Sequence, residues 1–324
     1  MAIGLRYVVT GSRGQLGRCL VRRLGLATGA VLAGEFARDR LDVSDAGAVA
    51  DALAMLPGGP PDVLLNAAAF NQVDSCEGDG SDDARRVNAE APGILARAAE
   101  GVGARLVHVS TDYVFPGDAT SPIPEDAAPG PRTAYGRSKL AGEVAALEAS
   151  PRSLVVRTSW VFGPGRNFVG AILRQARLRR EGEVEGPLRV VDDQRGYPTY
   201  ADDLAMGILE LAQAVEPGTD STGGGIYHLC NGPDPADDGP ITWWDFARSL
   251  LDARGFGDLQ IDRISTEESG ARAPRPAYSV LGCDRALALG VRLRSWRQAL
   301  DAYLGSPDLT TTLELQDPSA RVQQ

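Results

Sequence analysis

The sequence has few of the side chains that bind metals or form disulfides. Its 324 residues include only four cysteines and two histidines, at Cys19, Cys76, Cys230, Cys283, His108 and His228. The cysteines are scattered and form no C-x-x-C pair, and only the two histidines could join them as metal ligands. We therefore predict no zinc site, no other metal site and no disulfide framework, and expect reduced thiols.

Long apolar runs and an excess of positive charge are also missing. The sequence passes from Met1 into the apolar stretch 5–9 without a basic region, and no run approaches the roughly 20 apolar residues that span a bilayer. The formal net charge of −10 argues against nucleic-acid binding, which depends on clustered Lys and Arg. We expect a soluble, cytoplasmic protein whose partners are neither nucleic acids nor membranes. A local pocket could still bind a small anion.

Short strand-like runs alternate with amphipathic segments through the first half of the sequence. Strands are predicted at 5–10, 30–34, 62–66, 105–110 and 153–159, with helices from near residues 15, 45, 82 and 134. Repeated βαβ units of this kind predict an α/β fold, a doubly wound parallel sheet with helices on both faces.

The second half is less regular, because Pro and Gly interrupt it repeatedly. The runs 188–194 and 226–231 still predict strands, which we assign to elements returning to the same sheet. We predict a main domain over 1–160 with returning elements at about 186–230, and a smaller interleaved domain over 161–185 and 231–305. Residues 306–324 show no sustained periodicity and are predicted to form a mobile tail.

A glycine-rich turn follows the first predicted strand. Gly11, Gly14 and Gly17 are spaced by three residues in TGSRGQLG and lead into a helix. Glycines suit this place because the turn is tight, the backbone must approach a pyrophosphate, and the helix must pack closely on the strand. The helix N-terminus adds free N–H groups and a positive dipole end. In a βαβ series this motif predicts a dinucleotide-binding Rossmann domain.

Small residues follow the strand at 62–66. The run Ala67, Ala68 and Ala69 would let the backbone lie against a ribose, although an ordinary small-residue turn would look the same. We interpret this run as a second part of the cofactor site.

A tyrosine and a lysine four residues apart begin the helix near residue 134. On a helix, Tyr135 and Lys139 lie on one face, one turn apart. A tyrosine with an ordinary pKa of about 10 is a poor proton donor, but a nearby ammonium stabilises its phenolate and frees the proton for an alkoxide formed by hydride transfer. Thr111, at the end of strand 105–110, is predicted to bind the carbonyl oxygen, and Lys139 also the nicotinamide ribose. The alternative is an exposed Tyr–Lys pair without a role.

Ten segments carry a resemblance to a known family. They are TGSRGQLG (10–17), LNAAA (65–69), VHVSTDYVFPG (107–117), AYGRSKLAGE (134–143), RTSWVFG (157–163), NFV (167–169), DDQRGYPTYADDLA (192–205), YHLCN (227–231), ITWWDFA (241–247) and RPAYSVL (275–281). Over residues 5–300 the sequence resembles the dTDP-4-dehydrorhamnose reductases of the extended short-chain dehydrogenases. STDYVF and RTSWVFG are specific to this branch, whereas the glycine motif and Y-x-x-x-K occur across the superfamily.

The resemblance implies reduction of the 4-keto group of a dTDP-4-keto-6-deoxyhexose, in the biosynthesis of rhamnose or of a related sugar such as dihydrostreptose. It identifies Thr111, Tyr135 and Lys139 as the catalytic set. It also implies substrate contacts, with the hexose at Asp112, Tyr113 and Trp160 and with the rest of the nucleotide-sugar at Asn167 and Arg275.

Two of these substrate residues have alternatives. The indole of Trp160 sits at a predicted strand end and could lie against a sugar face, or it could be a buried core side chain. The planar guanidinium of Arg275 suits a diphosphate, but the alternative is an ordinary surface arginine with no ligand.

The resemblance also places an acidic residue, Asp42, beside the adenine, with a cap or turn role before the helix at Asp45 as the alternative. The full predicted cofactor set is Gly11, Arg13, Gly14, Gln15, Leu16, Gly17, Arg38, Asp42, Val43, Ala67, Ala68, Ala69, Tyr135 and Lys139.

The choice between NADPH and NADH depends on charge near the ribose 2′ position. An acidic residue there suits a free hydroxyl and an arginine suits a phosphate. The sequence offers Glu35 and Arg38 after the second strand and Arg13 in the glycine turn. The two arginines favour NADPH, and Glu35 leaves NADH use open.

Departures from the family pattern leave the exact sugar open. They are the segment 70–74, Tyr278 in place of a common Asn, and a longer loop at 233–240. The acidic stretch 74–83 is interpreted as a solvated loop rather than the metal-bridged dimer contact of some relatives. The sequence leaves open whether the protein forms a homodimer. Other functions of this fold are a nucleotide-sugar epimerase and a non-catalytic regulatory subunit like the methionine adenosyltransferase β-subunit.

Overall fold

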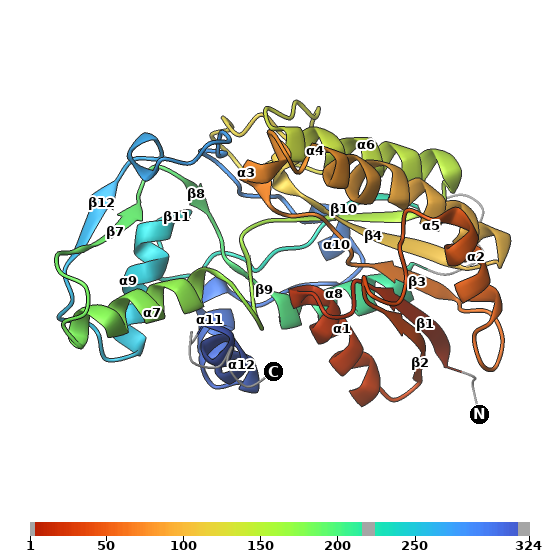
Figure 1. Cartoon of the computed structure of the whole chain (residues 1–324), viewed down its shortest axis with the longest axis horizontal. Coiled ribbons are helices and arrows are strands. Elements are labelled where there is room, and N and C mark those ends of the chain that lie inside the picture. Colours follow the sequence, from red (N-terminus) through yellow and green to blue (C-terminus); the bar gives the residue numbers. More distant parts are fainter. Residues whose placement is uncertain (1–3, 216–223, 317–324) are drawn as a thin grey trace.

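The computed structural model describes residues 4–215 and 224–316, and its largest element is a six-stranded parallel sheet. The strand order is β10-β5-β4-β3-β1-β2, which confirms the predicted doubly wound Rossmann architecture (Figure 1). The strands are β1 (Leu5–Thr10), β2 (Ala30–Phe36), β3 (Val63–Asn66), β4 (Arg105–Thr111), β5 (Leu154–Thr158) and β10 (Gly225–His228).

Side chains that alternate along each strand build one core on each face of the sheet. Tyr7 and Val9 pack with helices α1 and α8, whereas Val8 between them packs with α2, α5 and α6. The helices of this domain are α1 (Gln15–Leu26), α2 (Ala46–Ala54), α3 (Val73–Cys76), α4 (Ser81–Asp83), α5 (Ala91–Gly101), α6 (Ala134–Ala149), α8 (Ala201–Ala214) and α10 (Asp284–Ala288), with a π-helix (Ala84–Glu90) and a 3₁₀ turn (Asp112–Val114).

A second, smaller lobe lies at the other side of the molecule from β1 and β2 (Figure 1). Its core is rich in aromatic side chains, among them Phe162, Phe246, Trp296 and Tyr303. Its elements are β6 (Val161–Phe162), α7 (Phe168–Arg180), β7 (Leu188–Val191), β8 (Arg195–Gly196), β9 (Thr199–Tyr200), β11 (Ile241–Thr242), α9 (Trp243–Ala253), β12 (Ile261–Ile264), a 3₁₀ turn (Glu267–Ser269), α11 (Trp296–Leu304) and α12 (Pro307–Gln316).

Only one of the two segments predicted to return to the main sheet does so. The run 226–231 does return to the main sheet, as β10 beside β5. The run 188–194 does not, because β7 pairs with β12 in a separate two-stranded sheet of the smaller lobe. The prediction for that strand's location was therefore wrong, since its residues form a strand but its partner comes from more than seventy residues later.

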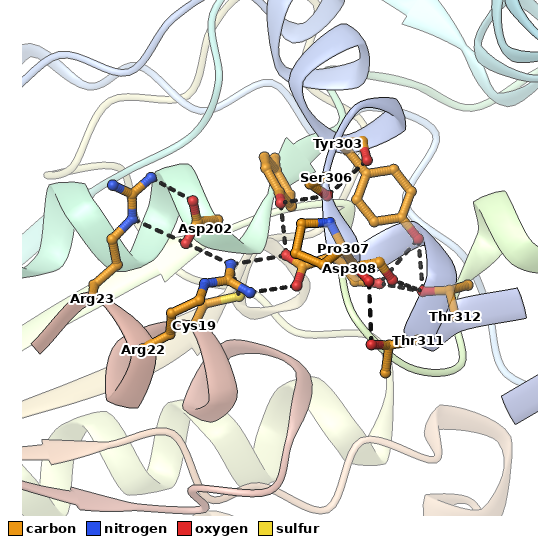
Figure 2. Close-up of polar contacts among 12 residues, drawn as sticks. Cys19, Arg22, Arg23, Asp202, Tyr303, Ser306, Pro307, Asp308, Thr311 and Thr312 are labelled. Carbon is orange, nitrogen blue, oxygen red and sulfur yellow. Dashed lines mark hydrogen bonds and ion pairs between the residues drawn. The ribbon is translucent and has the colours of Figure 1, made fainter. Parts of the chain in front are cut away.

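The chain after residue 306 also differs from the prediction of a tail. Residues 307–316 form α12, whose Asp308 and Thr312 are buried. Asp308 pairs with Arg22 of α1, and Thr312 accepts a hydrogen bond from the Tyr303 hydroxyl of the smaller lobe (Figure 2). The Thr312 hydroxyl also bonds the carbonyl oxygen of Gly163. The helix is thus held by polar anchors that hydrophobic periodicity does not reveal. Residues 317–324, the rest of the predicted tail, lie outside the described residues.

No helix within the described ranges is long and apolar enough to cross a membrane.

Candidate active site

The turn between β1 and α1 has the geometry that requires glycine. Gly11 has φ +72°, and a Cβ there would lie 2.6 Å from the backbone nitrogen of Ala68. A Cβ on Gly17 would lie 2.1 Å from the carbonyl oxygen of Gly11, so α1 packs directly on the turn. The tight turn and the close helix packing predicted from the motif are therefore both present. Gly17 supports the turn from within the helix.

A groove of about 340 Å³ opens beside this turn. Nine of the predicted cofactor residues line it, namely Gly11, Arg13, Gly14, Arg38, Asp42, Val43, Ala67, Ala68 and Ala69. Gly14 is the N-cap of α1 and has no side chain to accept the first N–H groups of the helix. The groove thus offers backbone donors and a positive dipole end to an anionic ligand.

Three arginines line the groove, and each lies near an aspartate. Arg13 pairs with Asp39 at 2.7 Å, and Arg38 lies 3.9 Å from Asp83 with most of its side chain exposed. Glu35 is exposed and is not among the groove residues.

The third arginine, Arg86, was missed by the sequence reasoning. It comes from the π-helix and pairs with Asp42 at 2.7 Å. Asp42 also accepts hydrogen bonds from the hydroxyl and N–H of Ser44, which together with Arg86 lower the pKa of its carboxyl. Of its alternative roles, Asp42 therefore has the one in the turn before α2, whose N-cap is Asp45. Asp42 also lines the groove, as predicted for a cofactor residue.

The groove continues into a second cleft of about 430 Å³, since Gly14 and Ala67–Ala69 line both. The predicted residues that line this cleft are Gly14, Gln15, Leu16, Ala67, Ala68, Ala69, Thr111, Asp112, Tyr113, Tyr135, Lys139 and Trp160. Ser110, Thr158 and Ser159 also line it. The structure thus brings together the glycine turn, the end of β4 and the start of α6, as predicted from their order in the sequence.

The start of α6 is fixed by two local features. Thr133 is the N-cap and accepts a hydrogen bond from the N–H of Gly136 at 2.9 Å. A Cβ on Gly136 would lie 2.2 Å from the carbonyl oxygen of Tyr113, so this glycine lets α6 contact the turn after β4. The ring of Tyr135 then meets Tyr113 edge to face, with centroids 5.5 Å apart.

Thr111 and Asp112 form a buried polar pair beneath the cleft. The Thr111 hydroxyl donates to one Asp112 oxygen at 3.0 Å, and the Ser279 hydroxyl donates to the other at 2.5 Å. Burial raises the pKa of Asp112 to about 6 despite these bonds. Burial, and then the charge of Asp112, raise the pKa of Tyr135 as well, while its hydrogen bond with Thr111 acts in the opposite direction.

Lys139 lies on the same face of α6 as Tyr135, but its amine bonds elsewhere. It donates to the carbonyl oxygen of Val109 at 2.7 Å and lies 3.3 Å from Nε2 of His108. Burial lowers the pKa of Lys139 to about 8, and Glu143 opposes that shift. The predicted lowering of the Tyr135 pKa is thus not seen in this arrangement, in which burial dominates both groups.

Trp160 has an unusual backbone conformation, with φ +52° in a region that is strained for a side chain other than glycine. Its indole stacks on Trp243 at 3.9 Å between centroids. A Cβ on Gly196 would lie 2.7 Å from the same indole. The side chain is half-buried and lines the cleft, so the fold positions it as a wall of the cleft rather than deep in a core.

Two predicted substrate residues lie outside this cleft. Asn167 caps α7 by accepting from Gly170 N–H, and its amide bonds the carbonyl oxygen of Gly165 at 3.0 Å. Its side chain therefore anchors the β6–α7 connection, and its predicted contact with the nucleotide-sugar stays a prediction.

Arg275 lines a small neighbouring pocket with Tyr113. Its guanidinium pairs with Asp74 at 2.8 Å and donates to the Ala273 carbonyl oxygen. The backbone N–H of Ala273 and then Arg275 lower the pKa of Asp74. Residue 74, expected in a solvated loop, instead lies in α3 and holds the 273–275 segment beside the site.

These features define a Rossmann-type reductase: a glycine turn, a strand-end threonine and a Tyr-x-x-x-Lys helix around one continuous cleft. Residues 5–307 match the family described as the RmlD substrate binding domain, and the chain belongs to that family.

Named relatives agree with this assignment. The chain is 43% identical to a probable dTDP-4,6-dihydroxy-2-methyloxan-3-one 4-ketoreductase of Streptomyces antibioticus, over 91% of this chain and 93% of the relative. It is 40% identical to the dTDP-4-dehydrorhamnose reductase of Streptomyces griseus, over 91% of each. The crystal structure of dTDP-4-dehydrorhamnose reductase from Bacillus anthracis in complex with NADP is similar, with TM-score 0.79, 32% identity, and coverage of 93% of this chain and 99% of that one.

Proposed function

We propose that this protein uses NADPH to reduce the 4-keto group of a dTDP-4-keto-6-deoxyhexose to a hydroxyl. The observation that carries the proposal is the cleft in which Thr111, Tyr135 and Lys139 meet the groove of the glycine turn. Relatives named for dTDP-sugar keto reduction, and one solved with NADP, support it. We assign the sheet domain to the cofactor and the smaller lobe to the nucleotide-sugar.

The residues present fit a dinucleotide. The uncapped N–H groups at the start of α1 suit a pyrophosphate, and the small side chains Ala67–Ala69 line the path from the groove to the cleft. A bound reduced nicotinamide supplies the hydride to the keto carbon.

The chain's own residues then handle the oxygen and the proton. Thr111 and Tyr135 hydrogen-bond the keto oxygen, and Tyr135 donates its proton as negative charge develops there. Asp112, Tyr113 and Trp160 line the same cleft and would contact the hexose. Arg275, next to Tyr113, would reach the diphosphate if it exchanged Asp74 for the ligand.

NADPH is favoured over NADH by the charges of the groove. Three arginines, Arg13, Arg38 and Arg86, line it against two aspartates, Asp42 and Asp83, whereas Glu35 does not line it. We expect the parent to prefer NADPH in kcat/KM, and the Arg13→Ala, Arg38→Ala double variant to lose most of that preference. A parent that prefers NADH, or a double variant with an unchanged preference, would contradict this assignment.

Turnover is tested by following the loss of reduced-cofactor absorbance with a freshly generated dTDP-4-keto-6-deoxysugar. The parent should consume the cofactor stoichiometrically with substrate. Tyr135→Phe should bind NADPH nearly as well but turn over on the order of 10²-fold or more slowly, the usual scale for a lost general acid. An epimerase would change the sugar without net cofactor loss, and a regulatory subunit would show no turnover, so either result refutes the proposal.

A further inference from the structure

A chain of four buried polar side chains crosses the sheet beneath the cleft and ends at Lys139. It begins at Thr10 on β1, continues through Asn66 on β3 and His108 on β4, and reaches the amine of Lys139 on α6. Each member is at most 2% exposed. Because β1, β3 and β4 are neighbours in the sheet, three strand positions far apart in sequence supply one continuous network.

The direction of the hydrogen bonds is fixed at Asn66. Its Oδ1 accepts from the Thr10 hydroxyl at 2.8 Å and from the backbone N–H of Ala68 at 3.1 Å. A backbone N–H can only donate, so Oδ1 must face it and Nδ2 must face His108. The amide therefore donates to Nδ1 of His108 across 3.0 Å.

The imidazole must then carry its proton on Nε2. Its Nδ1 lone pair is taken by Asn66, and burial, followed by the charge of Lys139, lowers the pKa of His108 well below its ordinary value. A neutral ring in this state presents an N–H at Nε2, 3.3 Å from the Lys139 amine. An N–H can donate to a neutral amine but opposes an ammonium.

We propose that Asn66 and His108 are positioning residues that favour the neutral amine of Lys139 in the resting site. Asn66 sets the tautomer, and the Nε2–H of His108 donates to the lysine lone pair while the lysine donates to Val109. The inference rests on the proposed function in one respect, since Lys139 belongs to the proposed catalytic set.

Other charged and titratable groups near Lys139 also influence the protonation of its amine. Glu143, one turn further along α6, favours the ammonium, but its carboxylate is held in a buried ion pair with Arg157 of β5. Asp112 and Tyr135 line the same cleft as Lys139. His108 and the carbonyl oxygen of Val109 both touch the amine of Lys139 directly.

The sequence makes this group directly measurable. Lys139 is the only lysine among the 324 residues, and every other basic side chain apart from the two histidines is arginine. Arginine cannot lose its proton in a protein, whereas lysine can. Lysine labelled with ¹⁵N and ¹³C would give a single side-chain resonance whose pH dependence reports Lys139 alone.

The first test needs no substitution. The protein has two histidines, and His228 places Nδ1 2.9 Å from the carbonyl oxygen of Gly282, so its proton is on Nδ1. Histidine labelled with ¹⁵N should therefore show one ring of each tautomer, with the Nε2–H ring assigned to His108 by its persistence in His228→Gln. Two Nδ1–H rings, or a charged His108 at neutral pH, would overturn the proposal.

The second test reverses the direction of the hydrogen bond between residue 66 and His108. Asn66→Asp keeps an oxygen toward Thr10 and Ala68 but turns an acceptor toward His108, which should move the ring proton to Nδ1 and let Nε2 accept from the ammonium. We expect Lys139 to titrate at least about one pH unit higher in this variant. The alkaline limb of kcat/KM should move in the same direction.

The matched control introduces the same charge without touching His108. Asn88 is buried and contacts α6 through the Ser138 hydroxyl at 3.1 Å. In Asn88→Asp the His108 tautomer should be unchanged and the Lys139 titration should move less than in Asn66→Asp. Equal shifts in the two variants would mean that charge alone acts, and would refute the role of the tautomer. Both spectra are recorded without substrate, so failure of the proposed reaction would leave this result interpretable.

Discussion

Replacing Asp308 by asparagine should weaken the attachment of α12 to α1, the helix that follows the glycine turn. Asp308 is 3% exposed and pairs with Arg22 (Figure 2). Its Oδ2 accepts from Arg22 at 2.9 Å and from the Tyr200 hydroxyl at 2.6 Å. Asparagine keeps one oxygen but turns an NH₂ group toward donors. The variant therefore loses a charge and gains a donor–donor conflict.

The magnitude follows from how much of the pair is buried. Breaking a fully buried ion pair costs roughly 3–5 kcal/mol, and an exposed one about 0–1 kcal/mol. The Arg22 side chain is 35% exposed and keeps Asp202 as a second partner at 2.8 Å, so it is not left unpaired. We expect a loss of about 2 kcal/mol in the free energy of unfolding, or a fall in Tm of roughly 3 °C for a chain of this length.

Thermal and urea unfolding of the parent, Asp308→Asn and Glu314→Gln would measure this. Glu314 is an exposed residue of the same helix, and its substitution should change stability by less than about 0.5 kcal/mol. The Asp308 effect should persist in 1 M salt, since burial shields the pair from screening. A loss equal to that of the control, or one that vanishes in salt, would refute the account of α12 as an anchored helix.

Further predictions concern the cleft and its groove. Gly196→Ala should push the indole of Trp160 and raise KM for the sugar at least several-fold while leaving the Kd for NADPH unchanged; parallel losses of both would point to a general packing defect instead. Arg86→Ala should weaken NADPH more than NADH in binding titrations, because the arginine lines the groove, and an equal effect on both would exclude a role at the 2′-phosphate. Asp112→Asn should flatten part of the stability–pH curve. Burial raises the pKa of Asp112 from 3.8 to about 6. The stability that protonated Asp112 contributes to the folded state is therefore fully present below pH 4 and is lost as the pH rises through about 6. At neutral pH the parent carries a cost on the order of 3 kcal/mol, less any bonds that asparagine loses. A variant whose Tm relative to the parent is the same at pH 4 and pH 8 would contradict this.

Local signals in the sequence predicted the sheet domain well. The strand at 5–10, the glycine turn and the helix at 134–149 depend on neighbours within a few residues, and the structure contains each of them. The Tyr135–Lys139 face needs only helical spacing, so its position beside the end of β4 followed from the βαβ order.

What the sequence could not predict depends on distant partners. The strand at 188–191 was recognised, but its pairing with residues 261–264 has no local signal. Asn167 was matched by its motif, yet an amide can cap a helix or bind a ligand equally well, and only the fold reveals that it caps α7.

The cofactor groove and the lysine illustrate the same limit. Arg86 reaches the groove from a π-helix 44 residues beyond its partner Asp42. Likewise, the contact of His108 with Lys139 requires knowing which side chains of β4 point toward α6. A histidine two residues before Ser110 offered no signal beyond its burial in a hydrophobic strand.

The pairing of Arg22 with Asp308 has a consequence for how the protein is made. The two residues are 286 positions apart, and ribosomes add about 5–20 residues per second. Asp308 is therefore synthesised roughly 15–60 s after Arg22. During that interval the strands and helices that form the groove can already assemble. The ion pair between Arg22 and Asp308, which joins α1 to α12, cannot yet form. The residues that line the groove, which end at Val87, are thus all synthesised well before Asp308 is available to pair with Arg22.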